Sequence, residues 1–192
     1  MSEITNDIEI ASATPEDGAR LCEIYAPYVE KTAVTFETVA PSPEQMSERI
    51  AQTLERYPFV VARRAGTIVG YAYAGPFRAR AAYDWSAEVS IYLAEDERGH
   101  GTGALLYDAL EDALRRMGIV NLYACIACCQ PADERLTDAS IRFHRKRGFT
   151  GVGRFAACAF KFDRWYDMVW MEKILSAHTD PPSPVTWWSE VQ

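Results

Sequence analysis

Apolar and polar positions alternate with two different periods along the chain. Alternation at every second position, or a short apolar run between turn residues, predicts strands at 8–13, 59–62, 67–74, 85–93, 122–128, 150–162 and 165–173. Apolar residues that recur every third or fourth position predict helices at 15–29, 43–56, 104–117 and 138–147. This order of elements predicts an α/β fold, with a mixed sheet and helices on both of its faces.

Several element boundaries carry their own signals. Thr14 before Pro15 is typical of a helix start, because the threonine can cap free N–H groups and the proline fits the first helical position. Gly118 and Gly148 follow the third and fourth predicted helices, where glycine favours termination. Residues 65–66 are an Ala-Gly pair between two strand-like runs, which predicts a hairpin.

Length and composition fit one globular domain with a tail. The chain has 192 residues, of which 48% are hydrophobic and 24% charged. We find no internal repeat and no linker, so we expect a single domain over residues 1–175. Residues 176–192 contain three prolines among polar residues and should be poorly ordered by themselves. Trp187 and Trp188 in this tail suggest docking against another surface.

Charge and cysteine usage exclude several classes of partner. The net charge of −7 has the wrong sign for a nucleic-acid binder that neutralises phosphates. No apolar run approaches the roughly 20 residues that span a bilayer, and residues 1–7 lack a secretory pattern, so we expect a cytoplasmic protein. Cys125 and Cys128 form a C-x-x-C pair with no second pair nearby, so we expect buried packing cysteines and no metal site.

The glycines between the strand at 85–93 and the helix at 104–117 are the strongest chemical signal. Gly99, Gly101 and Gly103 let the backbone turn sharply, and the free N–H groups of the helix's first turn suit a pyrophosphate. A glycine-rich turn before a packing helix is the alternative. The dinucleotide fingerprint G-x-G-x-x-G and the P-loop both fail to match the residues that follow.

Together with other segments, these residues resemble the GNAT acetyltransferase superfamily. Arg98 to Gly103 is similar to its Arg/Gln-x-x-Gly-x-Gly/Ala signature. Further segments resemble the phosphinothricin N-acetyltransferase branch: residues 35–37, 75–80, 82–88, 140–144 and 160–168. The resemblance covers residues 8–174 and implies the GNAT fold, a mixed, mostly antiparallel sheet that splays at an acetyl-CoA site.

The resemblance also implies which residues hold acetyl-CoA. Backbone groups of one strand would pair with the pantetheine arm and the acetyl carbonyl: Ile91, Tyr92 and Leu93. The following turn would bind the pyrophosphate: Arg98, Gly99, His100, Gly101, Thr102, Gly103 and Ala104. Ser140 matches a serine beside the thiol, and Thr137 stands where the family has asparagine. Lys146 matches a basic residue near the CoA phosphates, and a solvated surface lysine is the alternative.

Acetyl transfer needs a neutral amine, and Glu88 is the candidate general base. It precedes Ile91 by three residues in a largely apolar strand, where burial would raise the pKa of a carboxyl group. The resemblance gives this position the same role. An exposed strand glutamate, or a partner for Arg78 or Arg80, is the alternative.

The acceptor side is predicted from fewer signals. Arg78, Arg80 and Tyr83 precede Glu88, and a guanidinium is the natural partner of a substrate carboxylate, although a solvated loop arginine is equally plausible. The resemblance favours Arg80 and adds Phe36 and Tyr166, which read otherwise as ordinary packing aromatics. Tyr166 and Phe162 stand where herbicide-detoxifying members carry histidine, which leaves phosphinothricin itself open as a substrate.

We therefore expect an acetyl-CoA-dependent N-acetyltransferase that acts on a small amino-acid-like substrate of the phosphinothricin, methionine sulfone or methionine sulfoximine type. The alternatives are a peptide or protein N-acetyltransferase and a non-catalytic acetyl-CoA-binding module. Retention of Glu88 beside the glycine turn argues against the binding module, because a binder needs no base. The resemblance implies a homodimer, with which the aromatic C-terminal strands are compatible.

Overall fold

The computed structural model describes residues 8–131 and 133–191. Residues 1–7, on which the absence of a secretory pattern was argued, and Ala132 lie outside the described residues. The strands are β1 (Ile8–Ser12), β2 (Phe59–Arg64), β3 (Thr67–Pro76), β4 (Ser86–Leu93), β5 (Asn121–Cys128), β6 (Thr150–Lys161) and β7 (Arg164–Ile174). The helices are α1 (Gly18–Lys31), α2 (Pro43–Leu54), α3 (Thr102–Met117), α4 (Ala139–Lys146) and α5 (Trp188–Val191). Short 3-10 turns are η1 (Pro15–Asp17), η2 (Ala81–Tyr83) and η3 (Glu95–Glu97).

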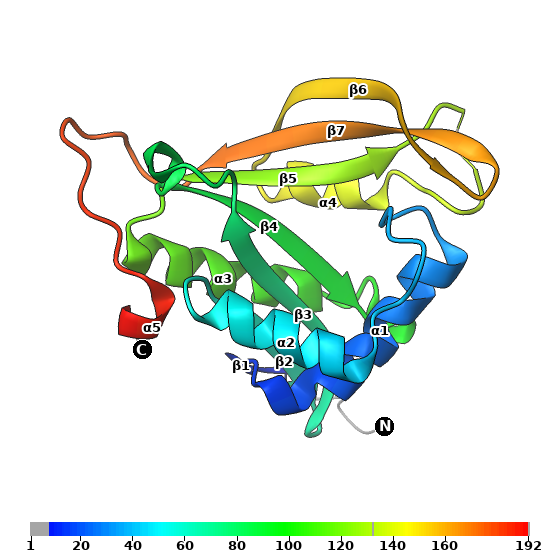
Figure 1. The fold of residues 1–192 in the computed structure, drawn as a ribbon, viewed down its shortest axis with the longest axis horizontal. Coiled ribbons are helices and arrows are strands. Elements are labelled where there is room, and N and C mark those ends of the chain that lie inside the picture. Colours follow the sequence, from blue (N-terminus) through cyan, green and yellow to red (C-terminus); the bar gives the residue numbers. More distant parts are fainter. Residues whose placement is uncertain (1–7, 132, 192) are drawn as a thin grey trace, which may run out of the picture.

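The described strands form one open sheet in the order β1-β2-β3-β4-β5-β7-β6 (Figure 1). Neighbouring strands run antiparallel except β4 and β5, which are parallel. The predicted mixed, mostly antiparallel sheet and every predicted strand and helix are therefore present. The first predicted helix begins as η1, because Thr14 and Asp17 form a reciprocal capping box around Pro15. Gly118 ends α3 in the left-handed region with φ of 87°, as predicted.

The sheet opens between β4 and β5. The two strands pair only at Ser86–Glu88, opposite Asn121–Tyr123, whereas β4 stays paired with β3 as far as Leu93. Figure 1 shows the two strands diverging beyond this point. The backbone of β4 after Glu88 therefore has no strand partner on the β5 side, and the predicted splay is confirmed.

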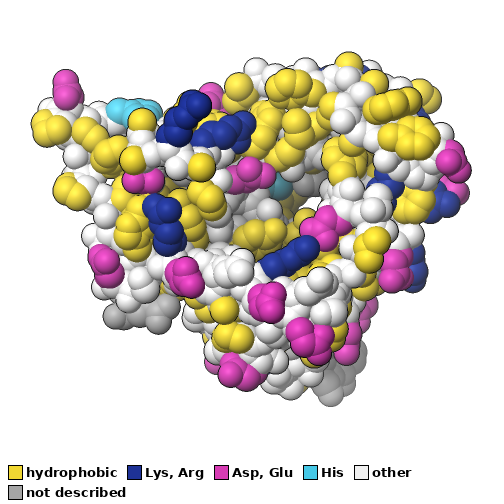
Figure 2. All heavy atoms as spheres, viewed as in Figure 1, with side chains coloured by type: hydrophobic (Ala, Val, Ile, Leu, Met, Phe, Trp, Pro, Cys, Tyr) yellow, Lys and Arg dark blue, Asp and Glu magenta, His cyan; other side chains and the backbone are white. Residues whose placement is uncertain are grey.

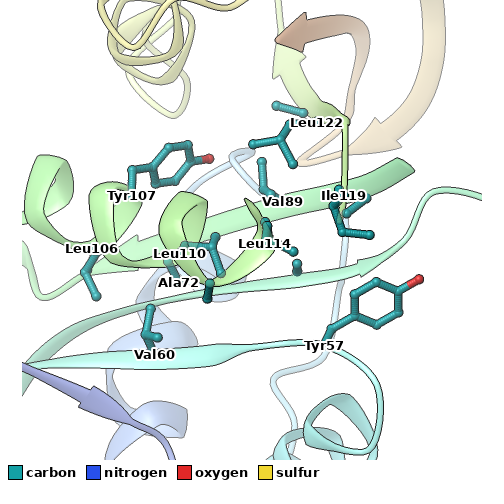
Figure 3. Close-up of a cluster of buried hydrophobic side chains, with 14 of the residues drawn as sticks. Tyr57, Val60, Ala72, Val89, Leu106, Tyr107, Leu110, Leu114, Ile119 and Leu122 are labelled. Carbon is teal, nitrogen blue, oxygen red and sulfur yellow. The ribbon is translucent and has the colours of Figure 1, made fainter. Parts of the chain in front are cut away.

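Helices cover both faces of the sheet. Leu110 and Leu114 of α3 lie against Ala72 and Val89 in the largest buried cluster (Figure 3). On the opposite face, α1 and α2 pack on β2 and β3 through side chains that include Leu21, Ile50, Phe59, Val61 and Tyr71. A third, smaller cluster consists of Ala33, Ala127, Leu136 and Tyr166. These apolar contacts fix the strands whose ends carry the candidate site.

The tail packs against the rest of its own chain. Trp188 is only 7% exposed and belongs to the largest core cluster, and the Trp187 ring lies 3.8 Å from the Arg56 guanidinium. The N–H of Thr186 donates to the Met117 carbonyl at 2.9 Å. The surface on which the tryptophans dock is thus this domain, and burial of Trp188 with partial burial of Trp187 orders a segment that its composition suggested would be poorly ordered by itself.

A further expectation concerns the cysteines of β5. Cys125 is exposed and Cys128 is only partly buried, so the prediction of buried packing cysteines was wrong for Cys125 and holds only in part for Cys128. The strand neighbours of Cys125, Ala124 and Ile126, belong to the α3-side core, and Cys125 points to the opposite face, where α1 and α2 pack on β2 and β3.

Within the described residues, no helix combines the length and apolarity needed to cross a bilayer.

Candidate active site

Glu88 lies where β4 separates from β5. It is the last β4 residue paired with β5, opposite Tyr123, and it also pairs with Gly75 of β3. Its neighbours Ala87 and Val89 are buried on the α3 side, so its side chain points to the other face. Partial burial raises the pKa of the Glu88 carboxyl above its ordinary value, and the Arg78 guanidinium opposes this shift. A raised pKa brings a carboxyl group closer to the range in which a general base works near neutral pH.

A cavity of about 370 Å³ lies on the same face, between α2 and β3. Figure 2 shows this face of the molecule hollowed at its centre. The lining of the cavity includes Tyr25, Arg49, Tyr73 and Tyr92, together with Gly75, the cross-strand partner of Glu88. The cavity therefore reaches the strand position opposite the candidate base, and its size suits a small ligand.

The predicted phosphate turn has two glycines in the left-handed region. Gly99 and Gly101 have φ of 86° and 89°, and Gly101 is the N-cap of α3 without a side-chain cap. The first N–H groups of α3 are thus not capped by a side chain and can face an anion. Gly103 serves a different purpose: a Cβ there would lie 3.2 Å from the Phe143 ring and 3.4 Å from Ile91. Ala104 donates its N–H back to the Gly101 carbonyl at 2.9 Å.

A buried ionic network holds this turn against the sheet. Glu97 is only 5% exposed and accepts hydrogen bonds from Arg64 of β2 at 2.7 and 3.1 Å. The hydroxyl of Thr102, the first residue of α3, donates to the same carboxylate. The Arg64 hydrogen bond lowers the pKa of Glu97, so the carboxylate is charged at neutral pH. The two ends of the turn are therefore fixed relative to each other.

The side chain of Tyr28 in α1 is hydrogen bonded to the last residue of β4. Its hydroxyl donates to the Leu93 carbonyl at 2.6 Å and accepts from the Leu93 N–H at 3.1 Å. The exposed Arg98 guanidinium lies 4.8 Å from the Tyr28 ring. Both polar backbone groups of Leu93 are thus hydrogen bonded within the protein. Ile91 and Tyr92 lie in the part of β4 that has left β5.

The predicted α4 residues lie at different distances from the buried interior. Thr137 is exposed before α4 and accepts a hydrogen bond from the Ala139 N–H at 3.4 Å. Ser140 is partly buried, 3.4 Å from Nδ1 of His144, and His144 is itself bonded to the buried Tyr107 hydroxyl. Lys146 is exposed in the last turn of α4. His100 is exposed within the glycine turn.

The predicted acceptor residues do not form one group. Arg78 lies beside Glu88, with its guanidinium over the Phe77 ring at 4.3 Å. Arg80 is exposed directly before η2, and Tyr83 is exposed at its end. Phe36 and Tyr166 meet on the far side of the opening with ring centroids 6.4 Å apart. Tyr166 is only 1% exposed, and its hydroxyl donates to Asp133 at 3.0 Å.

Sequence reasoning missed several residues of this face. Tyr25, Arg49 and Tyr73 line the cavity, and Lys161 is buried beside the loop that carries Phe36. A weak signal existed for the tyrosines, because Tyr25 and Tyr28 share one face of a helix and Tyr71 and Tyr73 share one face of a strand. Lys161 lies in the segment 160–168 that resembles the phosphinothricin branch, but this resemblance gave it no role, since its partners are more than a hundred residues away.

The comparison with protein families decides the fold family. The model of the acetyltransferase (GNAT) domain matches residues 10–170. The chain belongs to the GNAT acetyltransferase family. The predicted fold and the predicted enzyme class, an acyltransferase, are thereby confirmed, and members of this family use acetyl-CoA.

Individual relatives agree in extent. A phosphinothricin N-acetyltransferase of Streptomyces viridochromogenes is 32% identical over 185 residues, which cover 96% of this chain and 97% of that protein. A solved phosphinothricin acetyltransferase of Sinorhizobium meliloti, in complex with acetyl-CoA, has a TM-score of 0.83 at 32% identity, covering 96% of this chain and 98% of that one. A solved ribosomal-protein-alanine N-acetyltransferase of Brucella melitensis has a TM-score of 0.78 at 34% identity, covering 86% and 99%.

Candidate metal ligands do not gather in the described part of the chain. There, no group of three or more His, Cys, Asp or Glu side chains is placed to hold a metal ion.

Proposed function

We propose that this GNAT enzyme transfers the acetyl group of acetyl-CoA to the amino group of a small amino-acid-like substrate of the phosphinothricin, methionine sulfone or methionine sulfoximine type. One observation carries the proposal. The half-buried carboxylate of Glu88 lies at the point where β4 separates from β5. An aromatic cavity lies on one side of it, and the glycine turn lies at the other end of the stretch of β4 that has no partner on the β5 side.

The residues present fit acetyl-CoA. The N-terminus of α3 offers N–H groups without a side-chain cap to the pyrophosphate, and the open edge of β4 offers backbone groups to the pantetheine arm. Glu88 and Leu93 are separated by about 16 Å, at about 3.3 Å per strand residue. An extended arm can bridge that span. Acetyl-CoA supplies the thioester, and the chain orients it towards Glu88.

Glu88 is proposed to take the proton from the substrate ammonium, directly or through a water molecule. Only the ionised carboxylate can do this, so activity should be lost as the pH falls through the pKa of Glu88. Because burial raises that pKa, the loss should begin above the range of an ordinary glutamate. Arg78 beside Glu88, or Arg80 in the loop before it, is proposed to bind the substrate carboxylate.

A second copy of the chain is proposed as the partner. Large apolar side chains are exposed on β6 and β7: Val152, Phe155, Phe160 and Trp165. Figure 2 shows hydrophobic side chains gathered along this upper rim. Such a surface is typical of a homodimer interface. Sedimentation showing only monomer at micromolar concentration would contradict the proposed dimer.

We also propose a cytoplasmic location, with which the five free cysteines agree.

Thiol release from acetyl-CoA tests the function. The acceptors are free amino acids, methionine sulfone, methionine sulfoximine, phosphinothricin and a peptide that begins with alanine. We expect the small acceptors to be acetylated and the peptide to be poor. Preference for the peptide would support the second candidate, which the resemblance to the Brucella enzyme favours. Thiol release with none of them would leave only a binding module.

Glu88→Gln tests the base. We expect kcat to fall by roughly 10²- to 10⁴-fold with unchanged CoA affinity, because the neutral amide keeps the shape and cannot accept the proton. Glu95→Gln, at an exposed position of the same chain segment, is the control. Full turnover in Glu88→Gln would remove this residue from the mechanism.

A further inference from the structure

Lys161, the last residue of β6, is a buried charge with an unusual set of partners. Only 6% of the residue is exposed, and its ammonium donates to the carbonyls of Thr32 at 2.9 Å and Thr35 at 2.8 Å. Among the described residues, no carboxylate lies within ion-pair distance of it. Burial lowers the pKa of Lys161, and the more distant Glu37 opposes this shift. A buried charge whose partners are two carbonyls and the Phe162 ring, 5.0 Å away, calls for a role.

The two carbonyls belong to the loop between α1 and α2, and that loop holds the wall of the cavity. The Thr35 hydroxyl is hydrogen bonded to the Tyr25 hydroxyl at 2.8 Å and accepts from the Glu37 N–H at 3.3 Å. The Glu37 carboxylate in turn accepts two hydrogen bonds from Arg49, at 2.8 and 3.2 Å. Tyr25 and Arg49 both line the cavity. The position of Thr35 therefore fixes two lining side chains.

The other end of the contact is rigid. Lys161 lies at the turn between β6 and β7. The start of β7 is held by the Asp133 carboxylate, which accepts hydrogen bonds from Arg164 at 2.9 Å and from the Tyr166 hydroxyl at 3.0 Å. The Ala33 N–H donates to the Arg135 carbonyl at 3.0 Å, which joins the same loop to residues 133–136. Figure 1 shows the hairpin turn beside the α1–α2 connection. Lys161 thus connects the C-terminal hairpin to the acceptor wall across the opening of the sheet.

We propose that Lys161 is a positioning residue for the acceptor substrate. Its ammonium holds residues 32–37 in place and thereby sets the geometry of the Tyr25 and Arg49 wall, without contacting the reacting atoms. The inference rests on the proposed function, in which the cavity receives the amino-acid-like acceptor. An ammonium suits this task because it can donate to two carbonyls at once and accepts no hydrogen bond.

The test replaces the ammonium and keeps the length of the side chain. Lys161→Met is compared with Lys31→Met, an exposed lysine at the end of α1 next to the same loop. We expect the acceptor KM to rise roughly tenfold in Lys161→Met, because hydrogen bonds from charged groups are among the stronger ones, while kcat and CoA affinity stay within about twofold. Hydrogen exchange in residues 32–37 should accelerate only in Lys161→Met.

Four outcomes decide the matter. Unchanged acceptor KM and unchanged exchange in Lys161→Met would overturn the role of Lys161, and so would equal losses of acceptor and CoA affinity, which indicate general unfolding. If Lys161→Met does not fold, Lys161→Gln keeps a donor and should show a smaller rise in KM with normal CoA binding; a KM like that of wild type would also overturn the role. Wild-type enzyme without turnover on any small acceptor would sink the proposed function instead.

Discussion

The two sides of the proposed active site, a cofactor side and an acceptor side, are built in different ways. The cofactor side uses one continuous stretch, from Glu88 in β4 to Thr102 at the start of α3, and offers mainly backbone groups. The acceptor side uses side chains from three separate elements, Tyr25 of α1, Arg49 of α2 and Tyr73 of β3. Its loop is held by Lys161, far away in the sequence. One side can therefore keep a ligand while the other changes its preference.

Backbone recognition depends on dihedral angles, and those depend on a few glycines. Side-chain recognition depends on packing that several distant segments decide together. The difference predicts that substitutions in the glycine turn affect CoA binding alone, and that substitutions around the cavity affect the acceptor alone.

The largest effect is expected from Gly101→Val. With φ of 89°, Gly101 has a backbone conformation that a β-branched residue rarely adopts, although a Cβ there would meet open space. The turn must change, the first N–H groups of α3 lose their direction, and we expect CoA affinity to fall roughly 100-fold, which is about 2.7 kcal/mol. Isothermal titration with CoA measures it.

Gly118→Val is the matched control. Gly118 also has a positive φ, 87°, and it lies at the opposite end of α3 from the glycine turn. It should lose similar stability and no CoA affinity. If both variants bind CoA equally well, the pyrophosphate does not sit at the start of α3.

A smaller effect is expected from Thr102→Val. The substitution keeps the size of the side chain and removes the hydroxyl that donates to Glu97, while Arg64 still neutralises the carboxylate. A hydrogen bond to a charged group contributes roughly 1.5–3 kcal/mol, so CoA affinity should fall about tenfold if the bond orders the turn. Thr150→Val, on the exposed start of β6, serves as control. Unchanged CoA affinity with a lower Tm would reduce the network to a stabilising role.

The same difference explains what could be predicted from the sequence. The strand, the glycine turn and the helix from Ser86 to Met117 were predicted almost in full, because period, glycines and signature lie in one segment. Glu88 could be selected because its distance along the strand to the turn is fixed. The roles of Lys161, Asp133 and Arg49 could not be predicted, since their contacts are made by the tertiary fold; the resemblance of residues 160–168 marks the segment of Lys161 without naming its partners. The exposure of Cys125 was missed for the same reason: strand alternation does not say which face a helix covers.

The two sides meet at α1, where Tyr25 and Tyr28 stand one turn apart. Both rings pack edge-on against Tyr92, with centroids 4.8 and 5.1 Å away. The Tyr25 hydroxyl is bonded to Thr35 on the acceptor side, and the Tyr28 hydroxyl to Leu93 at the end of β4. Replacing either with phenylalanine removes one hydroxyl and leaves the ring packing in place.

These two substitutions form the finest test of the comparison. Each hydrogen bond contributes about 1 kcal/mol, so Tyr25→Phe, which loses the bond to Thr35, should lose about fivefold in affinity, and Tyr28→Phe, which loses both bonds to Leu93, at least as much. Tyr25→Phe should raise the acceptor KM and leave the dissociation constant of CoA unchanged, because its hydroxyl is bonded to Thr35 of the loop and its contact with β4 is to the side chain of Tyr92, not to the backbone. Tyr28→Phe should weaken CoA binding and leave the acceptor KM unchanged, because Leu93 loses both of its hydrogen bonds to α1 and the end of the strand proposed to hold the pantetheine arm is no longer fixed. Equal effects of both variants on both ligands would show that Tyr92 couples the two sides, and the separation drawn between them would fail.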